Sequence, residues 1–379
     1  MKRTVIVIML VLLAITSATL AQDMEKIVVG LSWNAYDVTL VYAWEAYMQS
    51  EGALLAAEAG VELEWIINAA DGDPARQAAN IEDLINQGVD IIIARAEDSA
   101  AIGASIRAAE EAGILFVTFD RASKTSPPAA HVGGDSYAQA LTTAEAFVEL
   151  LEAQGVTGEC IELQGSLTDE NAVNRSLAWN AIDEETDVYE TIVQVPTEWD
   201  ATLFLSGATN ALQANPDANC MFLASDFAIT SVQAALESAG RWVPAGEEGH
   251  MWLATQDLFP EALTLMEAGY IDVTTTYDAY EHAKEAARVV IAVALGEDPA
   301  CGENGCLVAG RVATPDTVDS LDNLWSRDFG EGASDAETVV VGLSWNAYDV
   351  TLVYAWEAYM QSEGALLAAE AGVELEWII

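Results

Sequence analysis

Basic residues are scarce in this chain of 379 residues. It has 14 Lys and Arg side chains against 61 Asp and Glu, with three histidines and a formal net charge of −47. A field this negative repels phosphate backbones and anionic lipid surfaces, which excludes nucleic acid and anionic membranes as favoured partners. We interpret the excess acid as a solvated shell suited to a saline or acidic habitat. A hydrophobic fraction of 52% argues against a disordered chain.

The sequence also lacks the short motifs that mark common enzymes. It has no nucleophile elbow, Walker motif, paired-histidine zinc helix or dinucleotide-binding glycine fingerprint. Pairs of acids are too frequent in this chain to indicate a glycosidase. The spacing of the few cysteines and histidines fits no zinc site. We therefore predict no catalytic residue, no metal site and no cofactor.

Long apolar runs are confined to the N-terminus. The basic residues Lys2 and Arg3 precede the apolar run Thr4–Ile15, and Ala21 ends a short stretch that suits signal peptidase. This pattern predicts a secretory signal peptide over residues 1–21, and the run is too short to span a bilayer as a mature helix. No cysteine lies near the cleavage point to carry a lipid. We expect a soluble periplasmic or secreted protein.

Only four cysteines are present, and an exported chain can oxidise them. Cys301 and Cys306 flank a turn-rich loop that a bridge could close. Cys160 and Cys220 each open an apolar, strand-like run. In doubly wound order the first and third strands of a lobe are neighbours, which would bring this second pair together. We expect both pairs to be oxidised.

Apolar runs alternate with helical patterns from about residue 27 to residue 294, which implies parallel sheets covered by helices on both faces. Nine strands would make a wide single sheet, and the stretch His131–Asp135 marks a break midway. The sequence therefore predicts an α/β fold of two doubly wound lobes joined by a hinge. The lobes comprise residues 27–134 with 278–300, and 135–277 with 301–318. The expected strands are Ile27–Leu31, Leu63–Ile67, Val89–Ala94, Leu115–Phe119, Cys160–Leu163, Thr191–Val195, Met221–Ala224, Met251–Thr255 and Val273–Thr276.

A long internal repeat is the strongest anomaly. Residues Val28–Ile67 recur without a change as Val340–Ile379. Such identity indicates a recent duplication, a truncated tandem gene or an assembly error, which we favour over strand exchange between molecules. We expect the first copy to fill the lobe, residues 319–338 to form a linker, and the duplicate of 27–67 at 339–379 to be peripheral. The protein is then a monomer unless the repeat drives swapping.

Two of the rare arginines stand at the ends of neighbouring apolar runs. Arg121 follows Asp120 at the end of one run, and Arg95 ends the preceding one. Ligands in open α/β sheets bind at the carboxyl ends of the strands. These residues therefore suggest a cleft that grips a small, oxygen-rich molecule. A salt bridge from Arg95 to Glu97 or Asp98 is the structural alternative.

Short polar motifs follow most of the expected strands or open the next helix. They are Gly30–Asn34, Phe119–Arg121, Asp169–Arg175, Thr197–Asp200, Ala224–Asp226, Thr255–Asp257 and Thr276–Tyr277. With these motifs the chain, from about residue 27 to residue 312, resembles the periplasmic sugar-binding proteins of ABC importers. The ribose- and xylose-binding branch is most similar. The resemblance implies a type I periplasmic binding fold.

By resemblance, sugar contacts fall on Asp120, Arg121, Arg175, Trp199 and Asp257. The chain departs from the family pattern in having Ser225 where many members have Asn, and Arg95 where the ribose branch has Asn. The segment from Tyr36 to Trp44 is also longer. These departures bear on which sugar is bound rather than on the class of ligand.

Carboxylates accept hydrogen bonds from sugar hydroxyls, guanidinium groups donate to them, and Trp33 and Trp199 could cover the two sugar faces. We expect Asp226 to cap the helix that starts near Ala228. The predicted function is capture of a monosaccharide and delivery to a membrane ABC permease. Alternatives are a sensory receptor for a chemoreceptor or kinase, a binder of acidic sugars or polyols, and a sugar-processing enzyme. The full set of predicted ligand-binding residues is Trp33, Asn34, Arg95, Asp120, Arg121, Asn171, Arg175, Trp199, Ser225, Asp257 and Tyr277.

Overall fold

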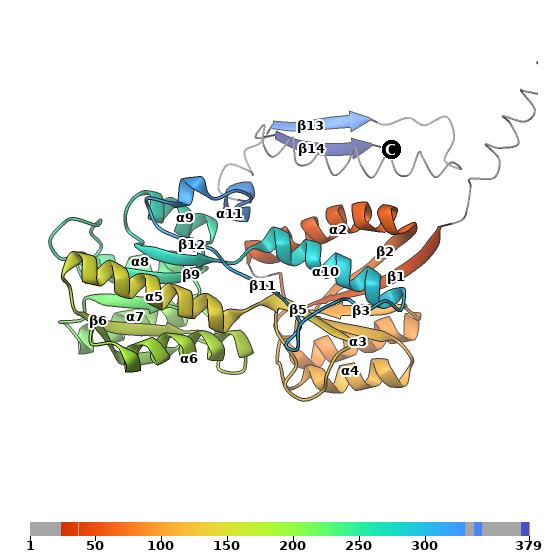
Figure 1. The fold of residues 1–379 in the computed structure, drawn as a ribbon, viewed down its shortest axis with the longest axis horizontal. Coiled ribbons are helices and arrows are strands. Elements are labelled where there is room, and N and C mark those ends of the chain that lie inside the picture. Colours follow the sequence, from red (N-terminus) through yellow and green to blue (C-terminus); the bar gives the residue numbers. More distant parts are fainter. Residues whose placement is uncertain (1–23, 37, 330–336, 343–372, 379) are drawn as a thin grey trace, which may run out of the picture.

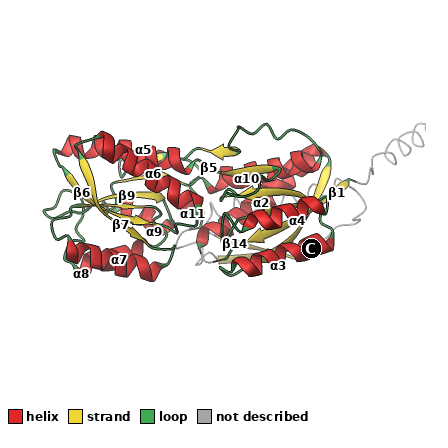
Figure 2. Cartoon of the chain, turned by 90° about the horizontal axis from the view of Figure 1, so that it is seen from below, coloured by secondary structure: helices red, strands yellow, loops and turns green. Residues whose placement is uncertain are grey.

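The computed structural model describes residues 24–36, 38–329, 337–342 and 373–378. The predicted signal peptide lies outside the described residues, as does most of the C-terminal copy of the repeat. The described chain forms two lobes, each built on a six-stranded sheet with helices on both faces (Figures 1 and 2). The predicted fold of two doubly wound α/β lobes is confirmed.

The first lobe has the strand order β11-β5-β4-β3-β1-β2, and all of its strands are parallel. Alternate residues of β1 face opposite sides, as the pleat requires. Val29 and Leu31 face the core under α2 and α10, whereas Val28 packs under α3 and α4. The elements are β1 (Glu25–Trp33), α2 (Thr39–Ala59), β2 (Val61–Ala69), α3 (Pro74–Gln87), β3 (Ile91–Ala94), α4 (Ile102–Glu111), β4 (Leu115–Phe119), β5 (Ala130–Gly134), α10 (Ala279–Ala294) and β11 (Cys306–Val308).

The second lobe repeats this plan with the order β12-β10-β9-β8-β6-β7, in which only β12 runs antiparallel. Trp179 is fully buried on one face of the sheet and stacks on Phe222, with ring centroids 4.4 Å apart. The elements are α5 (Ser136–Gln154), β6 (Gly158–Gln164), α6 (Glu170–Glu185), β7 (Tyr189–Pro196), α7 (Ala201–Ala214), β8 (Cys220–Leu223), α8 (Ile229–Ser238), β9 (Trp252–Asp257), α9 (Pro260–Glu267), β10 (Val273–Thr276) and β12 (Val312–Ala313).

Both predicted cysteine pairs lie within bonding distance. Cys160 and Cys220 face each other on the neighbouring strands β6 and β8, with Cα atoms 4.4 Å apart and an S–S distance of 2.00 Å. Cys301 and Cys306 close a short loop with Cα atoms 4.5 Å apart. The strand order, which makes β6 and β8 neighbours, therefore brings Cys160 and Cys220 together.

Within the described residues the chain crosses between the lobes three times. Two of the crossings run from β5 to α5 and from β10 to α10. The third differs, because residues Cys306–Val308 form β11 and pair with β5 of the first lobe. The crossing therefore follows Val308, and residues 301–308 do not belong to the second lobe. The stretch His131–Gly134, interpreted as a break, lies within strand β5.

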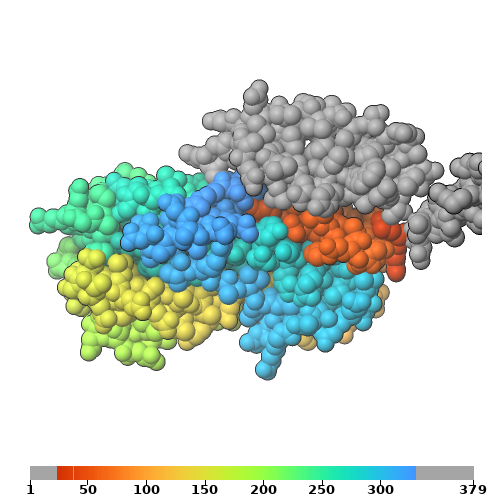
Figure 3. Space-filling model, turned by 45° about the horizontal axis from the view of Figure 1, so that its top comes forward, coloured from red at the N-terminus to blue at the C-terminus, as the bar shows by residue number. Residues whose placement is uncertain are grey.

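The predicted linker over 319–338 is wrong as far as Phe329. Residues Val318–Ser320 form a 3₁₀ helix, and α11 (Trp325–Asp328) contacts both lobes, with Trp325 only 1% exposed. Trp325 contacts Phe259 of the second lobe, whereas Tyr47 of the first lobe donates to Asp328 at 2.7 Å. In Figure 3 this part of the chain, drawn in blue, covers the junction of the lobes. Burial of a large aromatic side chain makes this segment part of the fold.

The two copies of the repeat occupy different places. β1 and β2 belong to the six-stranded sheet, whereas β13 (Glu337–Gly342) and β14 (Val373–Ile378) form a separate two-stranded parallel sheet (Figure 1). The pairing register is the same in both copies, with Val28 opposite Glu64 and Val340 opposite Glu376. The first copy therefore fills the lobe, as expected.

Candidate ligand-binding site

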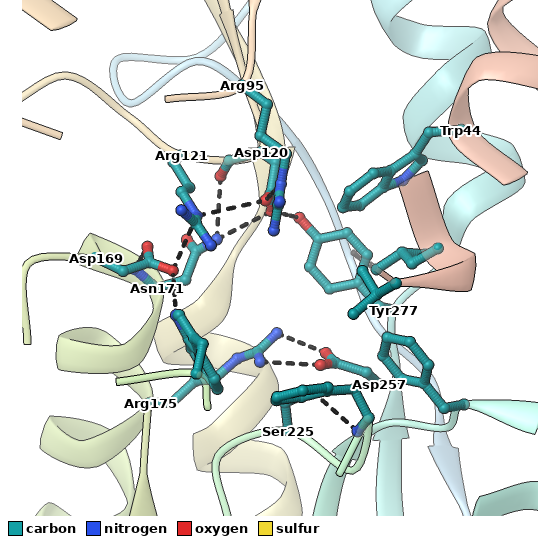
Figure 4. A pocket seen from close by; sticks show the side chains of 15 residues that line it. Trp44, Arg95, Asp120, Arg121, Asp169, Asn171, Arg175, Ser225, Asp257 and Tyr277 are labelled. Atoms are coloured by element: carbon teal, nitrogen blue, oxygen red, sulfur yellow. Dashed lines mark hydrogen bonds and ion pairs between the residues drawn. The ribbon is translucent and has the colours of Figure 1, made fainter. Parts of the chain in front are cut away.

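A pocket lies between the lobes, at the carboxyl ends of strands from both sheets (Figure 4). Its empty space is about 540 Å³ when the part open to solvent is counted. Nine of the eleven predicted ligand-binding residues line it. The lining residues are Val38, Leu40, Trp44, Arg95, Asp120, Arg121, Asp169, Asn171, Arg175, Trp199, Ser225, Phe227, Asp257, Phe259 and Tyr277.

Asp120 is the centre of the first lobe's wall. It directly follows β4, and Arg95 after β3 contacts its Oδ2 through Nε at 2.5 Å. Tyr277 donates to Asp120 Oδ1 at 2.6 Å and accepts from the Gly134 amide at 3.2 Å. Burial alone would raise the pKa of Asp120, but the charges of Arg95 and Arg121 and the Tyr277 hydrogen bond lower it to about 2. The carboxylate is therefore ionised and able to accept hydroxyl donors.

Asn34 does not line the pocket, although the sequence predicted that it would bind ligand. It is 2% exposed, and its Oδ1 accepts from Arg95 Nη1 at 2.6 Å. Its Nδ2 donates to Glu97 at 2.9 Å. Arg95 pairs with Asp120, which the salt-bridge alternative to Glu97 or Asp98 did not anticipate. Asn34 therefore holds the Arg95 guanidinium by a hydrogen bond from outside the pocket lining.

A second ion pair crosses from one lobe to the other. Arg121 Nε lies 3.0 Å from Oδ2 of Asp169, which caps the N-terminus of α6. Arg121 also donates to the Ala96 carbonyl oxygen at 3.0 Å. Asn171 of α6 donates to the Asp120 carboxylate at 3.0 Å. These contacts hold the two walls together at one side of the pocket.

A third ion pair forms the floor in the second lobe. Arg175 lies one turn after Asn171 on the same face of α6, and its Nη2 and Nη1 contact the two carboxylate oxygens of Asp257 at 2.6 and 3.1 Å. Arg175 also donates to the Ala224 carbonyl oxygen at 2.6 Å. Burial raises the pKa of Asp257, and the charge of Arg175 opposes that shift. The three arginines of the pocket thus each face an aspartate.

Of the two tryptophans predicted to cover the sugar faces, Trp199 lines the pocket and Trp33 does not. Trp33 is fully buried behind Trp44, with ring centroids 6.2 Å apart, and donates to Glu45 at 2.7 Å. The reason is the pleat of β1, which points Trp33 toward the core under α2. Trp44 of α2 lines the pocket instead, with the Arg95 guanidinium 5.3 Å from its ring centre. Trp199 lies on the other side, as predicted, and donates to Asp169 at 2.9 Å.

Six lining residues were missed by the sequence reasoning. Three of them stand beside or within predicted motifs, namely Asp169, Phe227 and Phe259, and could have been found from position. The other three lie in the segment from Tyr36 to Trp44, where helical periodicity is equally typical of core residues. They are Val38, Leu40 and Trp44.

Asp226 does not cap α8, which was the expected role. That helix follows Ala228 without a side-chain cap. The fully buried carboxylate instead accepts from the backbone amides of Leu258 and Phe259 at 3.2 and 2.8 Å and from the Thr255 hydroxyl at 2.8 Å. It therefore reaches the neighbouring loop, behind the pocket wall.

Other site types find no support within the described ranges. No group of three or more His, Cys, Asp or Glu side chains there could hold a metal ion. No helix in the same part of the chain is long and apolar enough to cross a membrane.

Comparison with known proteins gives the class. The model of the periplasmic binding protein domain matches residues 39–298, so the chain belongs to this extracytoplasmic family. Within the family it is a type I sugar-binding protein of the ABC import systems.

Among its relatives, the D-apiose import binding protein of Actinobacillus succinogenes is 28% identical over 63% of this chain and 74% of the relative. The ribose import binding protein of Escherichia coli is 24% identical over 60% of this chain and 72% of its own length. A solved ABC transporter solute-binding protein from Bacillus halodurans with bound myo-inositol has a TM-score of 0.67 and 25% identity, covering 79% of this chain and 98% of that chain. All three are named as binding proteins.

Proposed function

We propose that this protein captures a neutral monosaccharide between its lobes and delivers it to an ABC permease. The observation that carries the proposal is the set of three buried arginine–aspartate pairs in one interlobe pocket, flanked by Trp44 and Trp199. Paired carboxylates and guanidinium groups offer several acceptors and donors to sugar hydroxyls. Aromatic rings on both sides offer apolar surface to the C–H faces.

The balance of charge favours a neutral ligand. Each of Arg95, Arg121 and Arg175 already faces an aspartate of the protein. None of these arginines therefore needs an anionic ligand as its partner. Bringing a uronate into this pocket would add a charge without a dedicated partner, which is costly in a buried site. The relatives' printed ligands, D-apiose, ribose and myo-inositol, are neutral. We therefore rank a neutral aldose first and a uronic acid second.

A titration against a panel of pentoses, hexoses, polyols and uronic acids tests this proposal. Trp44 and Trp199 line the pocket, so tryptophan fluorescence should report binding. We expect saturable binding of a neutral sugar. Tighter binding of galacturonate or glucuronate than of any neutral member would overturn the ranking, and no binding across the panel would overturn the function.

Arg121 provides the residue-level test. Arg121→Ala should weaken binding about 10-fold or more while leaving the fold intact, because a charge-assisted hydrogen bond is worth about 1.5–3 kcal/mol. Arg241→Ala is the matched control, since Arg241 contacts only loop carbonyl oxygens outside the pocket lining in the described structure. Wild-type affinity in Arg121→Ala would remove Arg121 from the site.

Delivery to a permease is a separate claim with its own test. A fructose-binding periplasmic domain of a hybrid two-component system shares the fold at 18% identity and a TM-score of 0.65, which makes a sensory receptor the second candidate. Sugar-loaded protein should stimulate ATP hydrolysis by its cognate permease in proteoliposomes. Stimulation of a sensor kinase with no effect on any permease would favour sensing.

A further inference from the structure

Backbone strain gathers at the pocket. Of the eight non-glycine residues with positive φ in the described chain, five lie in three of the connections that carry pocket residues. Such conformations cost of order 1–3 kcal/mol each and persist only where the surroundings hold them. The five are Asp120 (62°), Glu198 (52°), Trp199 (56°), Asp257 (90°) and Leu258 (56°).

The turn at Asp257 and Leu258 is one of two places where such residues are consecutive. This turn ends β9 and places the Asp257 carboxylate on Arg175. It also leads directly into Phe259, another residue of the pocket wall. Because two left-handed residues in succession are unfavourable without glycine, something outside the turn must stabilise them.

Asp226 is placed to do this. Its Oδ1 accepts from the Phe259 amide at 2.8 Å, and its Oδ2 accepts from the Leu258 amide at 3.2 Å and from the Thr255 hydroxyl at 2.8 Å. The carboxylate therefore bonds to the chain on both sides of the turn. A backbone bond from the Asp226 amide to the Gln256 carbonyl oxygen, at 3.0 Å, joins the same two loops.

Asp226 itself cannot bind the ligand directly in this arrangement. It is 0% exposed and is not among the residues that line the pocket. It does not cap its own helix α8. A buried carboxylate is costly unless it is hydrogen-bonded, and its donors here all belong to the end of β9 and the turn that follows it.

We propose that Asp226 is a positioning residue of the sugar site, which holds the left-handed turn and so fixes Asp257 and Phe259. The proposal rests on the proposed function for its affinity readout. It assigns to Asp226 an effect on sugar affinity that is transmitted through the backbone of residues 257–259.

Asp226→Asn is the first test, because it keeps the size of the side chain and replaces an acceptor with a donor that faces backbone amides. We expect at least a 10-fold weaker affinity for the tightest-binding sugar of the panel, D-ribose being the first tried, measured by calorimetry. Asp272→Asn is the matched control: Asp272 is also a buried aspartate of the second lobe and accepts from a backbone amide, that of Leu253, at 2.8 Å. It should lower the melting temperature and leave affinity unchanged.

A rescue variant separates positioning from a purely structural role. Glycine adopts positive φ without steric cost, so Leu258→Gly lets the turn form with less help. Asp226→Asn/Leu258→Gly should recover most of the lost affinity, even though removing the buried leucine lowers stability. Wild-type affinity in Asp226→Asn, or the same loss with and without Leu258→Gly, would overturn the proposal.

Two further measurements keep the test decisive. In sugar-free protein, hydrogen exchange at the Leu258 and Phe259 amides should be faster in Asp226→Asn than in wild type, and unchanged exchange would overturn the proposal. This readout needs no ligand, so failure of the sugar panel would refute the proposed function alone. If Asp226→Asn does not fold, Thr255→Val is the milder variant, and wild-type affinity and exchange in it would overturn the proposal.

Discussion

Gly165 limits the position of Trp199 and offers a way to move that ring without touching the sugar. A Cβ atom at residue 165 would lie 2.1 Å from Cζ2 and 2.2 Å from Cη2 of Trp199. Carbon atoms pack at about 3.5–4.0 Å, so the ring must shift by roughly 1 Å or more in Gly165→Ala. The φ of Gly165 is not in the left-handed region, so the alanine meets the ring and not a backbone penalty. The hydrogen bond from Trp199 to Asp169, 2.9 Å long, would be lost or distorted.

The expected result is weaker sugar binding with a folded protein. A well-placed aromatic contact is worth about 0.5–1.5 kcal/mol, so the dissociation constant should rise roughly 2- to 13-fold. Calorimetry is the assay of choice, because displacement of Trp199 would itself change the fluorescence. Gly302→Ala is the control, since its Cβ would meet only the Gly305 carbonyl oxygen, at 3.6 Å. Wild-type affinity and melting temperature in Gly165→Ala would refute the role of the ring.

Four further outcomes are expected. The salt bridge between Lys124 and Glu170 joins the two lobes at 2.8 Å outside the pocket lining, so Lys124→Glu should weaken sugar binding a few-fold at low salt, and the double variant with Glu170→Lys should restore it. Burial would lower the pKa of His250, but the hydrogen bond and charge of Asp272 raise it above the ordinary value. The pair therefore stabilises the fold fully at a pH below the unfolded-state pKa of histidine. This stabilisation is lost as the pH rises through the folded-state pKa. The difference in melting temperature between wild type and His250→Gln should therefore shrink from about pH 5 to about pH 9, and a constant difference would contradict this assignment. Truncation after Phe329, which keeps the packed segment, should leave sugar binding unchanged and improve solubility, whereas loss of binding would show that the C-terminal copy completes the fold. Thiol titration of the denatured, exported protein should find no free cysteine, and four reactive thiols would exclude both bridges.

The alternation of strands and helices was enough to predict the lobes and much of the site. Parallel strands end at one edge of a sheet, so polar residues that follow successive apolar runs must converge there. That rule brought Arg95, Asp120 and Arg121 together from sequence alone. In the second lobe, Ser225 and Asp257 were proposed from the resemblance to the sugar-binding family, and both line the opposite wall.

Side-chain direction could not be read in the same way. Trp33 ends β1 and Trp44 lies in the first turns of α2, and from the sequence either ring could have faced the pocket. The outcome depends on the pleat of β1 and on how α2 packs on the sheet, which sequence periodicity does not determine. Arg95 illustrates the same limit, because its partner Asp120 is 25 positions away, whereas the acids considered from sequence were its near neighbours.

The short elements β11 and α11 were not predicted from the sequence, for a different reason. Strand β11 has three residues, too few to show alternation, so its membership of the first lobe emerges only from its pairing with β5. The segment after Ser320 has linker-like composition, yet Trp325 inserts between elements of the fold. One large aromatic side chain can order a polar stretch, because its burial offsets much of the entropy that ordering costs.

The charge pattern of the whole molecule explains why the pocket is built from pairs. With a net charge of −47, three unpaired aspartates at one buried site would bind protons or repel one another. At Asp120 the charges of Arg95 and Arg121 prevent this, and the pKa of that carboxyl is about 2 despite full burial. The pairs also leave unused acceptor and donor capacity on both partners, because a carboxylate has about four lone-pair positions and a guanidinium five hydrogens. An acidic protein can therefore present hydroxyl-binding carboxyl groups in a pocket where each of them faces a guanidinium group. Salt screens exposed charges more than buried ones. Added salt should therefore weaken the interactions of the acidic surface more than those of the buried arginine–aspartate pairs in the pocket.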